Sequence, residues 1–312
     1  MLRRVLWAGV GLAVLSGCGG GGSAPATSAG GSAVSPNPAP SPSPTPTPSP
    51  TPTTVAFAEE FNAAGLDRGI WTPEGSDFWV NNERQVYFDR PDTIEIRQGI
   101  EGADGGVLVL KPVWDPGNDP RQDRNANIVS GRINTRDNYD FTYGRAEARI
   151  KLPAGTGLWP AFWLLGNDTW PATGEIDIME NVGDAAWISA ALHGPGYSGN
   201  SPLSARFHFA AGSTVSDWHI YAVEWSADQI TFEVDGSAYY QVTRNDVTQY
   251  GDWAYDTPKH IILNFALGGD YPLAINGVIA PERGLPQSTI DAIQAGEVEM
   301  YVDWVRVTPP ES

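Results

Sequence analysis

The chain has 312 residues and a formal net charge of −18, with 37 acidic and 19 lysine or arginine side chains. An acidic surface disfavours nucleic acids and polyanionic polymers and suits a neutral partner. Glycine (35), proline (26) and tryptophan (12) are abundant, which is typical of many short strands and turns rather than long helices. Cys18 is the one cysteine, so the sequence predicts no intrachain disulfide.

Residues 1–18 have the features of an export signal. Arg3 and Arg4 precede a short apolar run at 5–15, which falls short of the roughly 20 residues of a transmembrane helix. The run ends in LSGC, which resembles a bacterial lipobox and implies lipid attachment at Cys18. A plain secretory signal is the alternative. We expect an exported lipoprotein at a cell surface or facing the periplasm, or released to the extracellular space.

Residues 19–54 predict a linker. A Gly/Ser/Ala segment is followed by proline at every second position from Pro36 to Pro52. Such a sequence favours polyproline II and builds no hydrophobic core. The composition of residues 55–312 is globular, and we expect one monomeric catalytic domain there, with the linker holding it away from a membrane.

Segments of the globular part have the apolar alternation or the buried runs of strands: 56–62, 79–88, 105–114, 145–152, 218–242, 261–270 and 299–308. In the second segment, we expect Trp79 and Asn81 on one strand face. In the fourth, Ala146 and Ala148 belong to a buried face. Asp235 and Gly236 predict a hairpin turn.

Three carboxylates interrupt the apolar run GEIDIMENVG at residues 174–183. On a helix, Glu175 and Glu180 would lie roughly 140° apart. On a regular strand, Glu175 and Asp177 share a face and Glu180 points the other way. One extra residue, a β-bulge at 178–179, returns Glu180 to the first face. The sequence therefore predicts a bulged strand with three carboxylates on one surface.

Paired carboxylates on one surface suit glycoside hydrolysis. At a separation of about 5–5.5 Å, one carboxylate attacks the sugar carbon and the other protonates the leaving oxygen, then activates water. Their repulsion raises one pKa, which keeps the acid protonated near neutral pH. An aspartate between them could hold the nucleophile through a shared proton. A solvated strand face and a three-carboxylate cation site are the alternatives.

The surrounding motifs are similar to those of a known family. Within residues 55–310 they read WVNNERQ, SGRINT, LWPAFW, GEIDIME, HGPGYSG, IILNFALGG and VDWVRV. They resemble laminarinase-type members of glycoside hydrolase family 16. The resemblance implies Glu175 as nucleophile, Glu180 as acid/base and Asp177 as their tuning partner. It also implies a β-jelly-roll sandwich of two antiparallel sheets with an open cleft, and endo-hydrolysis of β-1,3-glucan with retention of configuration and no catalytic cofactor.

Aromatic and polar side chains near the motif are candidates for binding sugar. Flat indoles match the apolar faces of pyranose rings, so the candidates include Trp159, Trp163 and Trp170. For Trp163, a core position is equally supported. The resemblance adds His193, Arg132 and Asn81. The alternatives are a structural role for the histidine and a surface salt bridge for the arginine.

The resemblance also implies a structural calcium. In this family an aspartate of the last strand binds the ion together with backbone carbonyls near the N-terminus. The matching residue is Asp303, with Glu60 and Gly106 as backbone partners. Calcium takes six to eight oxygen ligands, of which these residues supply only some.

Other functions compatible with the same motifs stay open. A non-catalytic glucan-binding lectin would use the same tryptophans, although relatives of that type have lost the glutamates. A family member could also cut mixed-linkage β-1,3/1,4-glucan or agarose, or act as a transglycosylase. Sulfated galactans fit the acidic charge poorly. The sequence does not separate β-1,3 from mixed linkage.

Overall fold

The computed structural model describes residues 55–120 and 126–310. The predicted signal (1–18), the lipidation site at Cys18 and the linker (19–54) lie outside these residues. None of the described helices has the length and apolar character needed to cross a membrane.

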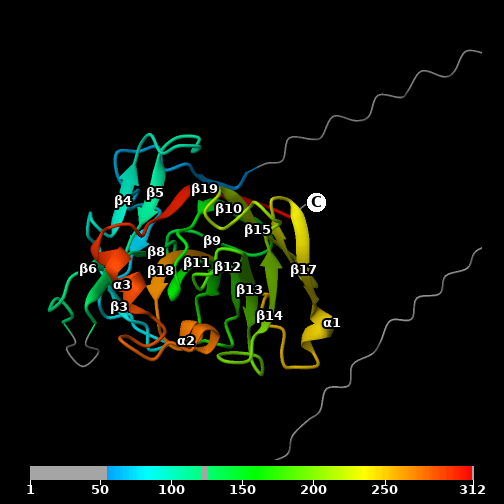
Figure 1. Ribbon diagram of the computed structural model, residues 1–312. Helices are drawn as coiled ribbons and strands as arrows, with labels where there is room; N and C mark the ends of the chain where they lie inside the picture. The colour runs from blue at the N-terminus through cyan, green and yellow to red at the C-terminus, as the bar shows by residue number, and fades with distance from the viewer. Residues whose placement is uncertain (1–54, 121–125, 311–312) are drawn as a thin grey trace, which may run out of the picture. The chain divides into compact units, whose positions relative to one another are not determined.

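Two antiparallel sheets enclose one hydrophobic core, as the expected all-β sandwich requires (Figure 1). The sheet that we call outer contains, in spatial order, β17 (Ser237–Thr243), β16 (Gln229–Val234), β15 (His219–Trp225), β10 (Gly144–Lys151), β19 (Met300–Thr308), β5 (Val107–Leu110) and β4 (Ile94–Arg97), with β1 (Phe57–Glu59) also paired to β19. The sheet that we call inner contains β14 (Leu203–His208), β13 (Trp187–His193), β12 (Glu175–Glu180), β11 (Leu158–Gly166), β18 (Lys259–Leu267), β8 (Arg132–Asn134) and β2 (Thr72–Pro73), with β9 (Asp140–Phe141) paired to β18.

Short elements complete the described unit. A small third sheet contains β3 (Gln85–Tyr87), β7 (Ile128–Ser130) and β6 (Val113–Trp114), and its β3–β7 pair is parallel. The helices are α1 (Arg244–Val247), α2 (Asp270–Asn276) and α3 (Gln287–Gln294). In Figure 1, α1 lies beside β17 and α3 beside β6, in agreement with their contacts.

The predicted alternation is confirmed where one face of a strand meets the core. On β10, Ala146, Ala148 and Ile150 are completely buried. Burying a side chain the size of isoleucine stabilises the fold by about 1.5–3 kcal/mol. At the turn between β16 and β17, Asp235 and Gly236 have φ of +50° and +74°, which fits the twist of a tight hairpin.

The strand predicted at residues 79–88 is wrong for its first half, because only Gln85–Tyr87 pair as β3. Asn81 and Asn82 have φ of +55° and +54°, a left-handed conformation that a strand does not allow. Trp79 and Asn81 therefore share no strand face. Instead, the Asn81 carbonyl accepts a hydrogen bond from the backbone N–H of Asp270 (2.9 Å), so this segment packs against the start of α2.

Candidate active site

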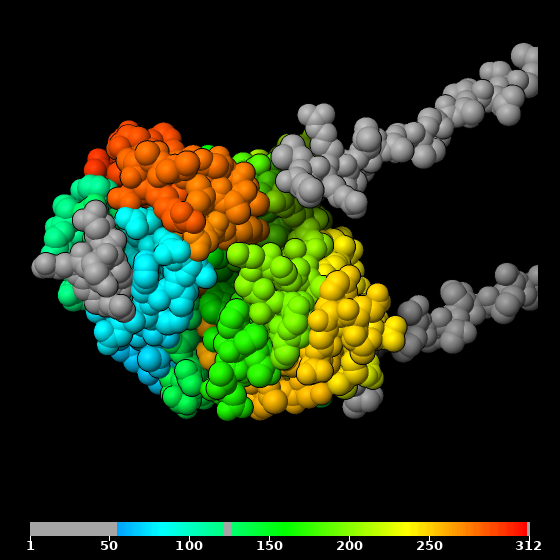
Figure 2. Space-filling model, turned by 90° about the horizontal axis from the view of Figure 1, so that it is seen from below, coloured from blue at the N-terminus to red at the C-terminus, as the bar shows by residue number. Residues whose placement is uncertain are grey.

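The predicted bulge lies in β12. Asp177 pairs with Trp163 and Met179 with Phe162 on β11, so Ile178 is the extra residue. Ile178 and Met179 both belong to the hydrophobic core. Because two successive residues point into the core, the in-and-out alternation of the strand shifts by one residue. Glu180 therefore lies on the face that carries Glu175 and Asp177. In Figure 2, this side of the molecule is hollowed, with green segments lying deep between cyan and orange ones and yellow-green ones.

Each glutamate of β12 is held by a tryptophan. Trp170 Nε1 donates to Glu175 Oε2 (2.9 Å), and Trp159 Nε1 donates to Glu180 Oε1 (2.8 Å). Trp170 is 46% exposed, which leaves much of its indole free to meet a ligand. The structure thus brings two of the three predicted tryptophans to the carboxylates.

Asp177 and His193 lie between these groups. His193 Nε2 is 3.3 Å from Asp177 Oδ2 and 3.7 Å from Glu175 Oε1. The side chain of Glu175 lowers the pKa of Asp177, which fits a proton shared between the two. Ligand atoms of Glu175, Asp177 and His193 all lie within 4.8 Å of one another, so this trio has the spacing of a cation site as well.

Electrostatics favour protons on this cluster. The pKa values of Glu175, Asp177 and Glu180 are each raised to about 8, chiefly by burial and, for both glutamates, also by the charge of Asp177. His193 and the two tryptophan N–H groups act in the opposite direction on the glutamates. A cluster that keeps a proton near neutral pH beside an ionised carboxylate can do acid/base work.

Arg132 lies in a buried aromatic setting. It is 4% exposed, and its guanidinium carbon is 4.0 Å from the Phe78 ring centroid and 4.9 Å from that of Trp163. The alternative of a surface salt bridge is therefore wrong. Trp163 Nε1 donates to Asn264 Oδ1 (2.7 Å), which holds this indole on the cleft face of the inner sheet rather than in the core.

Glu83 is a buried carboxylate near the site that was not predicted from the sequence. Burial raises its pKa to about 7, while the charge of Arg132 lowers it. Gln85 donates to Glu83 (2.6 Å), and the exposed Asn81 lies at hydrogen-bond distance (3.4 Å) from the same carboxylate. Asn81 is thus within hydrogen-bond distance of a carboxylate on which the charge of Arg132 acts.

Tyr271 on α2 and Ser189 on β13 were also missed. The Tyr271 hydroxyl is 3.0 Å from Ser189 Oγ, and the Tyr271 ring meets Trp159 edge to face. Ser189 pairs directly with Glu180 across the strands. In the sequence only the double glycine at 268–269 marks this place, because the contacts that bring Tyr271 here are not local.

A buried lysine supports the turn that leads into Glu175. Lys259 Nζ donates to the carbonyls of Thr173 (2.7 Å) and Ala254 (3.2 Å). Gly174 has φ of +72°, and a Cβ there would lie 2.1 Å from the Ala254 oxygen, so only glycine fits. Lys259 thus joins the turn before β12 to residues 252–256.

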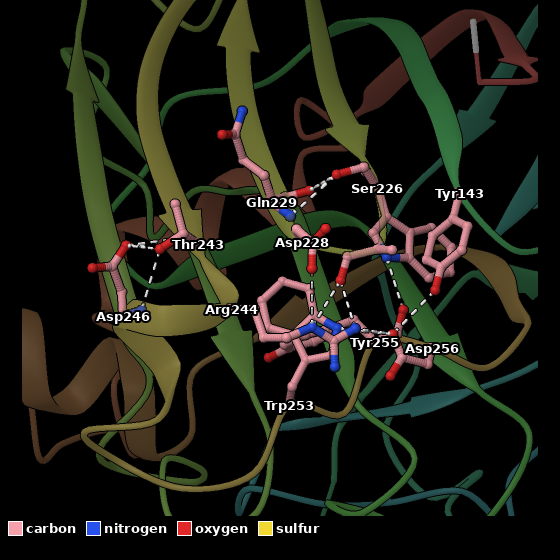
Figure 3. Close-up of polar contacts among 12 residues, drawn as sticks. Tyr143, Ser226, Asp228, Gln229, Thr243, Arg244, Asp246, Trp253, Tyr255 and Asp256 are labelled. Carbon is pink, nitrogen blue, oxygen red and sulfur yellow. Dashed lines mark hydrogen bonds and ion pairs between the residues drawn. The ribbon is translucent and has the colours of Figure 1, made fainter. Parts of the chain in front are cut away.

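Residues 252–256 are themselves anchored on both sides. Tyr255 Oη donates to the His193 carbonyl (3.1 Å), which supports the active-site histidine. Figure 3 shows Asp256 meeting Arg244, Tyr143 and Trp253, with hydrogen bonds of 2.5, 3.0 and 3.1 Å. Both neighbours of Glu175, the turn before it and His193, therefore rest on this segment.

Of the predicted calcium ligands, the carboxylate of Asp303 has protein partners. Asp303 is buried, its Oδ2 pairs with Arg149, and its Oδ1 accepts the backbone N–H of Asp104 (3.0 Å). The Glu60 side chain pairs with Arg306 (2.9 Å), and Gly106 N–H donates to Asn62. Arg149 balances the charge of Asp303, and calcium binding by Asp303 with the backbone carbonyls of Glu60 and Gly106 stays a prediction of the resemblance.

A two-sheet sandwich with paired glutamates on one face of a sheet is the architecture of a glycoside hydrolase. The family model of glycosyl hydrolases family 16 matches residues 121–278. A beta-glucanase of Rhodothermus marinus is 31% identical over 268 residues, which cover 81% of this chain and 84% of that protein. The chain belongs to glycosyl hydrolase family 16.

Further relatives agree. The glucan endo-1,3-beta-glucosidase A1 of Niallia circulans is 33% identical over 68% of this chain, which spans only about a third (33%) of that longer protein. The laminarinase catalytic domain of Thermotoga maritima superimposes with a TM-score of 0.70 at 29% identity, covering 83% of this chain and 99% of that one.

Proposed function

We propose that this glycoside hydrolase cuts β-1,3-glucan within the chain, with retention of configuration. The observation that carries the proposal is the bulged strand β12, which presents Glu175 and Glu180 on one cleft face with an indole N–H on each. The names of the relatives from Niallia circulans and Thermotoga maritima support the substrate. A neutral glucan also suits a chain with a net charge of −18.

The reaction would proceed in two steps. Glu175 attacks the anomeric carbon while Glu180 gives its proton to the departing glycosidic oxygen. Glu180, now ionised, removes a proton from water, whose oxygen displaces Glu175 from the sugar. Burial raises the pKa of both glutamates to about 8, which favours the proton that Glu180 must give. Trp170 and His193 act against this rise at Glu175 and favour the ionised form that attacks the sugar.

The first test is the Glu175→Gln variant on laminarin, with reducing ends and product sizes as the measurement. We expect turnover to fall by about three orders of magnitude or more, because the amide cannot form the glycosyl ester. The matched control is Glu297→Gln, an exposed position, which should keep wild-type rates. Substantial turnover by Glu175→Gln would sink the assignment. Release of new ends from lichenan would widen the substrate to mixed linkage, and binding without new ends would favour a lectin.

We further propose that the protein is exported, carries lipid on Cys18 and works as a monomer at a cell surface or in the periplasm. The LSGC string supports the lipid, and the stretch of alternating prolines after it supports a spacer.

A further inference from the structure

A row of cleft-facing positions crosses the inner sheet through Glu180. Strand register places these residues side by side in the order Arg132, Asn264, Ala161, Glu180, Ser189 and Arg206. The row ends in an arginine on each side of the catalytic strand. We call the side of β11, β18 and β8 the first arm of the cleft, and the side of β13 and β14 the second arm.

Arg206 at the end of the second arm is unpaired. On β14, Leu203 and Phe207 pack against the core, while Arg206 is exposed on the opposite face. In the part of the chain that the structure describes, the Arg206 side chain makes no hydrogen bond or ion pair. In so acidic a chain, a guanidinium without a carboxylate leaves all five of its N–H donors available to a ligand.

The guanidinium is nevertheless held in place. Its central carbon lies 3.9 Å from the ring centroid of Trp187, which is buried on the cleft face of β13. A cation stacked on an indole keeps its plane fixed while its edge stays free to donate. An oriented edge of donors suits the paired hydroxyls of a sugar ring.

Ser189 and Tyr271 connect Arg206 to the catalytic strand. Ser189 pairs with Glu180 on one side and with Arg206 on the other, and its Oγ is 3.0 Å from the Tyr271 hydroxyl. Arg206 lies two strand spacings from Glu180, about 10 Å. It is therefore placed to meet the second sugar beyond the cleaved bond rather than the first.

We propose that Arg206, stacked on Trp187, binds hydroxyl groups of the glucan on the leaving-group side. This inference rests on the proposed function. The first arm holds Arg132 buried between Phe78 and Trp163, which suits the sugar that stays attached to Glu175. The second arm is open at Arg206, so the departing chain can leave there and water can enter.

The test compares two substrates in the Arg206→Met variant, which keeps an apolar stem on Trp187 and removes the donors. One series is β-1,3-linked gluco-oligosaccharides of increasing length, with product sizes giving the cleaved bond. The other is a nitrophenyl glycoside of the β-1,3-linked disaccharide, whose phenol is too short to reach Arg206. We expect kcat/KM for the long oligosaccharides to fall about tenfold more than kcat/KM for the nitrophenyl glycoside.

Arg306→Met is the matched control, since Arg306 also stacks on an indole, with its guanidinium carbon 4.1 Å from the Trp304 centroid, but on the outer sheet. Its two rates should keep the wild-type ratio. An equal loss on both substrates in Arg206→Met, or a loss that grows with sugars on the non-reducing side, would overturn the inference. If the wild type cuts no oligosaccharide and no nitrophenyl glycoside, the proposed function itself fails.

Discussion

Among single residues, Asp177 is the carboxylate whose charge the site supports least. It is 5% exposed, and its Oδ2 receives no hydrogen bond from the described residues. Burial raises its pKa to about 8 from an ordinary value of 3.8. Between about pH 4 and about pH 8, the folded protein therefore keeps a proton on Asp177 that the unfolded chain has already released. Across this window, Asp177 lowers stability as pH rises.

Replacing Asp177 by Asn removes this titration with little change of shape. We expect the melting temperature of Asp177→Asn to exceed that of the wild type by a few degrees at about pH 8, and by much less at about pH 4.5. Activity should fall, because the amide cannot share a proton with Glu175 in the same way. Thermal unfolding at both pH values measures the effect, with the exposed Asp291→Asn as control. A difference in melting temperature that does not depend on pH would contradict the argument.

Among structural elements, the turn before β12 is held in place by a buried lysine, Lys259. Lys259 is completely buried, and burial lowers its pKa to about 8. No carboxylate of the described residues forms a salt bridge with it, and the rings of Trp225 and Tyr255 lie 5.5 and 5.6 Å from Nζ. Its ammonium donates hydrogen bonds to the Thr173 and Ala254 carbonyls, and without the lysine these carbonyls would lose that donor.

We predict that Lys259→Met lowers kcat about tenfold with a smaller change in KM, because Trp170 and Glu175 lose their fixed geometry while the cleft stays open. Steady-state kinetics on laminarin measures the split between the two constants. The comparison variant is Val305→Ala, which opens a cavity in the core beneath the outer sheet. If both variants lose melting temperature and kcat to the same degree, Lys259 has only a structural role.

These elements also show what the sequence could predict. The bulge followed from period-2 geometry, since a single extra residue at 178–179 reconciles Glu175 with Glu180. The turn at 79–84 was mistaken for a strand, because its conformation depends on the distant Gly269, where a Cβ would lie 2.6 Å from the Asn81 oxygen. Arg206 reaches the cleft through the register of β14, and Tyr271 through the position of α2. Neither is encoded in one local stretch of sequence.

For the whole molecule, charge and the proposed anchor act in opposite directions at a membrane. All aspartates and glutamates lie beyond residue 54, in the segment that holds the catalytic unit. Anionic lipid headgroups repel such a surface, so we expect the catalytic unit to have no affinity of its own for a membrane. Retention would then depend on the lipid proposed at Cys18, whose chains are held by the hydrophobic effect and are insensitive to salt.

In cells that process bacterial lipoproteins, we expect glucanase activity of the wild type to sediment with membranes, to resist a high-salt wash and to be released by detergent. Cys18→Ser removes the acceptor sulfur. It should move the activity to the soluble fraction or leave it on an unprocessed precursor, as the mass of the product will show. The fractionation of activity between membrane and supernatant is the measurement. Wild-type protein that is soluble from the start would instead identify residues 1–18 as a secretory signal without lipid, and a Cys18→Ser protein that is processed and still bound would place the anchor elsewhere.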